Sequence, residues 1–68
     1  MDFYLEQQEF IELNKLLKLV GLVETGGEAR QVILAGEVKV NGDTEFRVRN
    51  KLRQGFIVEF HGQTIHIT

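Results

Sequence analysis

Apolar residues recur at helical spacing in the first third of the chain. Between residues 9 and 20 a row of them falls three or four positions apart, and two further apolar residues widen it: Phe10, Leu13, Leu17 and Val20, with Ile11 and Leu16. This spacing is typical of an amphipathic helix with one buried face. We predict a helix over residues 9–20 that ends at Gly21, preceded by residues 1–8 as a loose arm or one more helical turn.

A second helix is predicted from the segment Thr25-Gly26-Gly27-Glu28. Its spacing is that of a capping box, in which the Thr25 hydroxyl accepts a hydrogen bond from one free amide and Glu28 reaches back to another. The buried face and the glycine that ends the helix follow at helical spacing: Ala29, Val32, Ile33 and Gly36. The glycine pair could instead seat a phosphate at the helix start. Glu24 and Glu28 would repel that anion, so capping is the favoured interpretation.

The apolar period changes to two after the second helix, which predicts strands. Val38 and Val40 precede the turn signal Asn41-Gly42, and Phe46 follows it. A two-residue loop would send the apolar residues of the two strands to opposite faces. We therefore predict a three-residue loop, Asn41 to Asp43, which sets Val38 opposite Phe46.

A final hairpin is predicted with an even loop, because its first strand has apolar residues at even positions and its second at odd ones: Phe56, Val58 and Phe60, then Ile65 and Ile67. Gly62-Gln63 suits a type II′ turn, in which glycine comes first. This register pairs Phe60 with Ile65 and Glu59 with His66.

The order of these elements predicts an α+β fold, in which two N-terminal helices precede a small antiparallel sheet of about four strands. With 68 residues and no cysteine, the chain is expected to be a single domain that apolar packing alone stabilises. It contains no apolar run long enough to span a membrane, and its first ten residues lack the layout of a secretory signal. We therefore expect a soluble, cytoplasmic protein.

The charges are unevenly distributed, although the net charge is only −2. Residues 1–29 contain two cations and six anions, whereas residues 30–53 contain six cations and three anions. In the predicted register Lys39 lies opposite Glu45, and Glu37 lies opposite Arg47. Cross-strand pairing would therefore explain two of the cations.

Arg49, Lys51 and Arg53 have no such partner. Together with Arg47, their odd numbering places them along one side of the chain where it is extended, with Leu52 turned inward. A row of this kind matches the repeated negative charge of a nucleic-acid backbone, and guanidinium groups can bind phosphate through two hydrogen bonds. The pattern favours nucleic-acid binding.

Catalysis is not indicated. The chain has no serine or cysteine nucleophile, and neither His61 nor His66 is placed beside an evident catalytic partner. No carboxylate is set by the sequence beside an acid–base partner in a fold large enough to enclose a substrate. We expect no enzyme activity, no cofactor, no metal site and no small-molecule substrate. Most of the five phenylalanines are expected in the core, so phosphate contacts should dominate over base stacking.

Residues 25–42, TGGEARQVILAGEVKVNG, resemble the small RNA-binding domain first recognised in ribosomal small-subunit protein S-four, also called the alpha-L motif. The family pattern is a helix, then Ser/Thr-x-x-x-Ala, then Gly-x-Val-x-Val-Asn-Gly. Leu13 and Leu17 fit the first helix, while Gly55, Val58 and Phe60 fit the closing strand.

The resemblance implies an RNA-binding module, most similar to the small stand-alone bacterial members. Many members carry an arginine at the start of the first-helix motif and another just after the Ser/Thr, where this chain has Glu12 and Gly26. Lys15 and Lys18 share one face of the first helix, with Glu12 within reach of Lys15. These two lysines, Arg30 and Lys39 could border the helix-to-strand surface.

We therefore expect a non-catalytic, monomeric module of translation that holds structured RNA, either rRNA or tRNA. The expected RNA-binding residues are the eight cations Lys15, Lys18, Arg30, Lys39, Arg47, Arg49, Lys51 and Arg53. The alternative is a protein-interaction adaptor whose acidic first half docks a basic partner, with Ile57 as an outward apolar contact.

Overall fold

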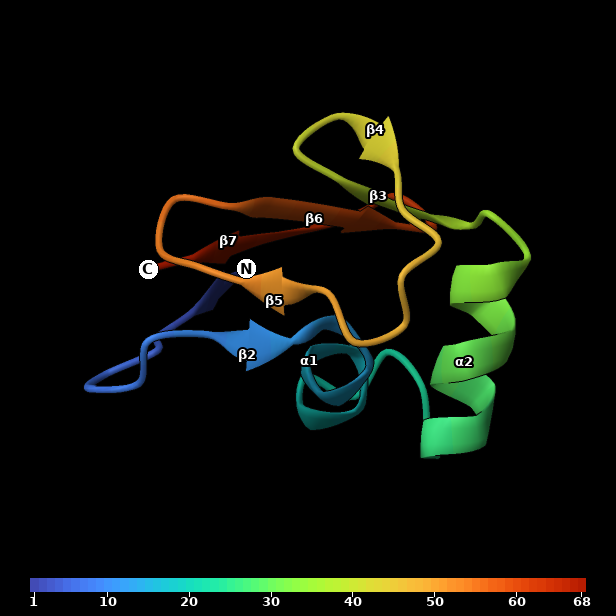
Figure 1. The fold of residues 1–68 in the computed structure, drawn as a ribbon, viewed down its shortest axis with the longest axis horizontal. Coiled ribbons are helices and arrows are strands. Elements are labelled where there is room, and N and C mark those ends of the chain that lie inside the picture. Colours follow the sequence, from blue (N-terminus) through green and yellow to red (C-terminus); the bar gives the residue numbers. More distant parts are fainter.

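A computed structural model describes residues 1–68 (Figure 1). Its elements in chain order are β1 (Asp2–Phe3), β2 (Ile11–Glu12), α1 (Leu13–Leu19), α2 (Gly26–Leu34), β3 (Val38–Val40), β4 (Asp43–Thr44), β5 (Lys51–Leu52), β6 (Ile57–Phe60) and β7 (Gln63–Ile67). Five strands form one sheet in the order β1-β7-β6-β3-β4, and β2 pairs with β5 in a second, two-stranded sheet. The α+β class is confirmed. The larger sheet is mixed, because β1 runs parallel to β7, and two short strands precede the helices.

The N-terminal residues are a strand and not the predicted loose arm or helical turn. Asp2 lies beside His66 and Phe3 beside Ile67 in the parallel pair of β1 and β7. Leu5 is buried, and its amide donates to the carbonyl of Thr68 at 2.9 Å. A partner more than sixty residues away leaves no local signal in the sequence, so only the structure reveals this edge of the sheet.

Helix α1 begins at Leu13, four residues later than the prediction. The preceding strand β2 pairs with β5, so that Ile11 lies opposite Leu52. Part of the apolar pattern that predicted one helix therefore belongs to a strand, and the helix begins only after it. The predicted end is confirmed: Gly21 has a φ of 80°, and the amide of Leu22 donates to the carbonyl of Leu17, which closes the helix.

Helix α2 begins with the predicted cap. The Thr25 hydroxyl oxygen accepts a hydrogen bond from the Glu28 amide at 3.0 Å. The Glu28 carboxylate accepts from the amide of Glu24 at 2.7 Å, one residue before the position that a capping box implies. Ala29 and Ile33 are buried, as expected for the inner face of this helix.

The β3–β4 hairpin has a two-residue turn, so the predicted three-residue loop is wrong. Val40 lies opposite Asp43, and Lys39 lies opposite Thr44. Asn41 and Gly42 have φ values of 53° and 88°, which is the type I′ geometry that Asn-Gly prefers. Strand β4 is only two residues long. The alternating apolar residues on which the prediction of the second strand rested therefore follow β4 and lie outside the paired strand.

The β6–β7 hairpin has an even loop, as predicted, but the loop is His61-Gly62 and not Gly62-Gln63. Phe60 lies opposite Gln63, and Glu59 lies opposite Thr64. Both loop residues have positive φ, 47° and 79°, which again indicates a type I′ turn. His66 consequently lies opposite Ile57 and not opposite Glu59.

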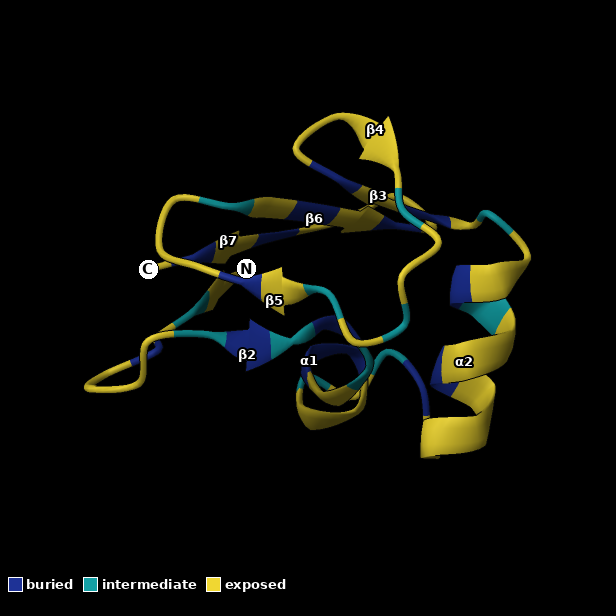
Figure 2. Ribbon diagram, in the orientation of Figure 1, coloured by how far each residue is buried: buried dark blue, intermediate teal, exposed yellow.

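One apolar core joins the helices to the sheets. All fifteen buried residues are apolar, and they belong to a single cluster. Along β6 and β7, buried residues alternate with exposed ones (Figure 2). One face of the larger sheet therefore lies against the core, and the other carries outward residues such as Lys39, Glu59 and Thr64. None of the helices has the length and apolar character that crossing a membrane requires.

Candidate nucleic-acid interface

Four cations lie on the stretch of chain between β4 and β6, which we call the basic segment: residues 47–53, with Arg47, Arg49, Lys51 and Arg53. All four are exposed, and the connection between β4 and β5 alternates between exposed and half-buried residues (Figure 2). In Figure 1 this connection runs from β4 to the start of α1 before it enters β5. The segment therefore presents positive charge along an outer strip of the molecule.

The basic segment is held firmly at the start of α1. The amides of Leu13 and Asn14 donate to the carbonyls of Asn50 and Val48 at 2.9 and 3.0 Å. Leu52 is fully buried and anchors the end of the segment in the core. These contacts use amides that a helix start otherwise leaves without partners. The backbone that carries the cations is thus fixed by the fold.

Glu45 organises the beginning of the segment. One carboxylate oxygen accepts hydrogen bonds from the amide and the Nε of Arg47, both at 2.9 Å. The other accepts from Nη2 of Arg47 and from the side-chain amide of Asn50, both at 3.1 Å. The side-chain hydrogen bond from Arg47 lowers the pKa of Glu45, and the same contact raises the pKa of Arg47. Arg47 is therefore the one cation of the segment whose charge a carboxylate balances directly.

The two predicted cross-strand ion pairs are wrong. Glu45 binds Arg47 instead of Lys39, and Glu37 contacts the ring of His61 instead of Arg47. The two-residue turn is the cause, because it shifts the register on which both pairs depended.

Lys51 and Arg53 lie over one aromatic ring. The Nζ of Lys51 is 5.0 Å from the centre of the Phe10 ring, and the Cζ of Arg53 is 5.6 Å from it. These are cation–π distances. The ring holds both cations on the outer side of β5 while Leu52 points into the core, as the alternation predicted.

Arg47, Arg49 and Lys51 line a shallow hollow of about 380 Å³ together with Asn50. The segment is not extended throughout, because Val48 and Arg49 form a turn. The turn gathers these three cations around the hollow, whereas a straight strand would have spaced them in a row. Arg53 continues the positive surface from Lys51 across Phe10.

Lys15 and Lys18 lie on the exposed side of α1. Lys15 pairs with Glu12 at 3.6 Å, as its spacing predicted. Glu12 is in turn the strand partner of Lys51, so Lys15 borders the basic segment and Lys18 follows one turn later. Arg30 and Lys39 are placed differently: Arg30 is exposed on α2, and Lys39 is on the outward face of the sheet opposite Glu59.

Only two of the eight lysines and arginines have a carboxylate within 4.0 Å, namely Lys15 and Arg47. The other six are Lys18, Arg30, Lys39, Arg49, Lys51 and Arg53. Three of these six belong to the basic segment. The unbalanced cations are therefore concentrated there, although the chain as a whole is acidic.

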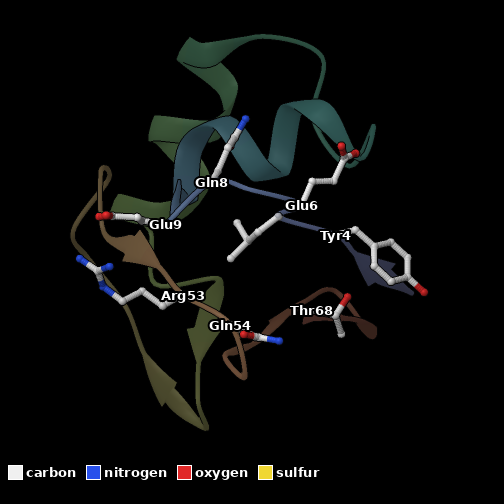
Figure 3. A pocket seen from close by; sticks show the side chains of 8 residues that line it. Tyr4, Glu6, Gln8, Glu9, Arg53, Gln54 and Thr68 are labelled. Atoms are coloured by element: carbon white, nitrogen blue, oxygen red, sulfur yellow. The ribbon is translucent and has the colours of Figure 1, made fainter.

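Arg53 also borders a larger hollow of about 740 Å³ between residues 4–9, which connect β1 to β2, and the end of the basic segment. Figure 3 shows the Arg53 side chain at one side of it near Glu9, with Tyr4 at the other side. Its lining is mostly polar: Tyr4, Leu5, Glu6, Gln8, Glu9, Arg53, Gln54 and Thr68. This hollow could not be predicted, because half of its lining comes from residues expected to form a loose arm.

Sequence reasoning missed two residues that shape the site. Glu45 was assigned to a cross-strand pair, although it stands only two residues from the arginine that it binds. Phe10 was assigned to the buried stripe of a helix, but it is half-buried beneath Lys51 and Arg53. A carboxylate two residues before an arginine was the available signal for Glu45, and no signal in the sequence distinguished Phe10.

Comparison with known proteins decides the family, because residues 3–68 match the S4 domain. The chain belongs to the S4 domain family. This is the family named after the ribosomal protein that residues 25–42 resemble, so that resemblance is confirmed.

This S4 domain is similar to small bacterial proteins along most of its length. YbcJ of Escherichia coli, named as a candidate RNA-binding protein, is 40% identical over 65 residues, which cover 96% of this chain and 93% of YbcJ. RlbA of Bacillus subtilis, named as a candidate ribosome maturation protein, is 37% identical over 54 residues, or 79% of this chain and 76% of RlbA. Neither name describes an enzyme.

The fold of this S4 domain also matches a solved structure. The solution structure of YbcJ is described as an αL motif involved in RNA binding, and it superimposes with a TM-score of 0.75 at 39% identity. The match covers 98% of this chain and 85% of YbcJ. The two helices and the sheet of this S4 domain are therefore the αL architecture.

Proposed function

We propose that this S4 domain is a non-catalytic RNA-binding module that holds structured RNA through the basic segment. The observation that carries the proposal is the group formed by Arg49, Lys51 and Arg53, three exposed cations without a carboxylate within 4.0 Å. The names of YbcJ and RlbA support it, since one describes RNA binding and the other ribosome maturation. Ribosomal RNA is accordingly favoured over tRNA as the partner.

The binding mechanism is phosphate neutralisation on a prearranged scaffold. Each cation of the segment can replace counterions at an RNA phosphate, and arginine can do so through two parallel hydrogen bonds. Because the backbone is already fixed at Val48, Asn50 and Leu52, little chain entropy is lost on binding. Arg47 contributes less net charge, but the guanidinium has N–H groups beyond the two that Glu45 occupies, and these can donate to a phosphate.

The other predicted residues take unequal parts in this proposal. Lys15 and Lys18 extend the positive surface along α1 from the strand pair of Glu12 and Lys51. Arg30 and Lys39 would contact only an RNA that reaches past α2 or onto the outward face of the sheet.

A paired substitution tests the proposal. Arg49→Gln with Arg53→Gln removes two positive charges, and it should weaken binding of a labelled rRNA hairpin or tRNA transcript at least about tenfold, because bonds to charged groups contribute about 1.5–3 kcal/mol each. Fluorescence anisotropy measures the affinity, and circular dichroism checks the fold. The matched control is Thr64→Glu with His66→Glu on the outward side of β7, which lowers the net charge equally.

The control variant should bind nearly as well as the unmodified protein. Equal losses in both variants would mean that net charge alone matters, and the basic segment would then not be the site. Failure of the unmodified protein to bind any structured RNA at low salt would contradict the RNA-binding function itself.

The alternative is a protein-interaction adaptor that docks a basic partner through the acidic first half. Ile57 is 37% exposed on the outward face, as that hypothesis expects. Two of the acidic residues are engaged within the fold, however, since Glu12 pairs with Lys15 and Glu28 caps α2. In the experiment above, the adaptor hypothesis predicts no RNA binding that depends on Arg49 and Arg53.

A further inference from the structure

Three of the five phenylalanines serve the core, as expected, and two do not. Phe60 is buried, and Phe3 and Phe56 pack against the core cluster. Phe10 lies beneath Lys51 and Arg53. Phe46 is 56% exposed and has no cation over it. The argument against base stacking therefore no longer applies to Phe46.

We infer that Phe46 is a stacking platform for an unpaired RNA base at the edge of the basic segment. The inference deepens the proposed RNA-binding function and rests on it. The ligand is a nucleobase in a bulge, loop or strand end, since a base within a duplex is already stacked between its neighbours.

The Phe46 ring is supported from one side by a glycine. A Cβ at Gly36 would lie 3.4 Å from Cε1 and 3.6 Å from Cζ of this ring, so the ring packs beside Gly36. Gly36 has a φ of 77°, which already favours glycine at that position. Phe46 keeps 56% of its surface exposed despite this contact, so a base can reach the ring.

The backbone on both sides of Phe46 is fixed. The amide of Glu45 donates to the carbonyl of Val38 at 2.9 Å, and the amide of Arg47 donates to the Glu45 carboxylate at 2.9 Å. A ring on a fixed backbone loses little freedom when a base packs against it, which favours binding. Phe46 thus differs from an exposed residue on a free loop.

The charges near Phe46 indicate which partner the ring would meet. Arg47 is the next residue, and Arg49 is three residues away, a distance that the chain spans in at most about 11 Å. One short stretch of RNA can therefore place a phosphate at the arginines and a base on the ring. Stacking on an aromatic side chain suits any base, because every base has a π face. An apolar protein surface, in contrast, would have to desolvate these charges.

Two duplexes that differ by one unpaired nucleotide provide the test. Phe46→Leu keeps an apolar side chain but removes the π face, so it should weaken binding to the bulged duplex roughly 5- to 100-fold and leave binding to the fully paired duplex unchanged. Phe46→Trp should retain the preference for the bulge. Ile57→Ala is the control, because Ile57 is an exposed apolar residue on the outward face of β6, outside the basic segment, and should not affect binding to either duplex.

A fluorescent adenine analogue at the bulge gives a direct readout, because its emission should be quenched when the unmodified protein binds and not when Phe46→Leu binds. Equal affinity of both proteins for both duplexes would overturn the stacking platform while the proposed function stands. An equal loss on both duplexes would also overturn it, since it would assign Phe46 a role in shaping the segment. If neither duplex bound the unmodified protein, the proposed function would fail together with this inference, and Phe46 would be a candidate protein contact.

Discussion

At the scale of single residues, Glu45 illustrates how a carboxylate can help a basic surface. It accepts three hydrogen bonds from Arg47 and one from Asn50, and these join the two ends of the turn that carries Arg49. It also cancels one positive charge of the segment. We expect the loss of this charge to cost less binding free energy than the fixed arrangement of the remaining cations gains.

Substitution of Glu45 should produce a pH-dependent loss of stability. The folded-state pKa of Glu45 is lowered, so its stabilising effect is complete above the ordinary glutamate pKa of about 4.3 and disappears as the pH falls through the lower folded value. We expect Glu45→Gln to lower the melting temperature by a few degrees at pH 7, with the difference from the unmodified protein closing toward pH 3. Thermal unfolding at both pH values measures this.

The exposed residue Glu24 provides a control for the Glu45 experiment, because its side chain takes part in no ion pair or hydrogen bond of the fold. Glu24→Gln should leave the melting temperature nearly unchanged at both pH values. A stability difference for Glu45→Gln that persisted undiminished at pH 3 would contradict the role of the ionised carboxylate.

The burial of single residues could be predicted from the apolar pattern in some elements and not in others. The period of apolar residues identified the inner faces of β6 and β7, where Val58, Phe60, Ile65 and Ile67 are buried. It failed for Phe10 and Phe46. Periodicity assigns a residue to a face, whereas burial depends on whether another element covers that face.

Among helices and strands, the sequence predicted features that depend on neighbouring residues, and it did not predict pairings between segments that are distant in the chain. The Thr25 cap and the ends of both helices at glycine followed from residues within one or two turns. The pairings of β1 with β7 and of β2 with β5 join segments about forty to sixty residues apart, and no local pattern announces them. In the β3–β4 hairpin two local signals disagreed, and the intrinsic geometry of Asn-Gly prevailed over strand alternation.

The cap of α2 can be tested directly. Thr25→Ala removes the oxygen that accepts from the Glu28 amide, and it should cost about 1 kcal/mol of stability, or about 4–8 °C in melting temperature for a domain of this size. Thermal unfolding by circular dichroism measures the change. Thr64→Ala is the matched control, since the exposed Thr64 side chain makes no hydrogen bond, and an equal loss in both variants would argue against the capping contact.

For the whole molecule, the sequence predicted where the cations are concentrated along the chain but not how the fold arranges them in space. The concentration of cations in residues 47–53 was evident from the sequence, and so was the lack of partners for Arg49, Lys51 and Arg53. The gathering of Arg47, Arg49 and Lys51 around a turn beside α1 could not be predicted, because it depends on hydrogen bonds from the amides of Leu13 and Asn14. The separation of Lys39 from this group likewise follows only from the sheet.

A salt titration of the affinity shows whether RNA binds through phosphates at the basic segment. If about four phosphates are neutralised, log affinity should fall against log salt with a slope of about −3 on single-stranded RNA, and Arg49→Gln with Arg53→Gln should reduce that slope to about half. The Thr64→Glu and His66→Glu control should keep the full slope. A slope near zero for the unmodified protein, or one that the two arginine substitutions leave unchanged, would rule out phosphate binding at the basic segment.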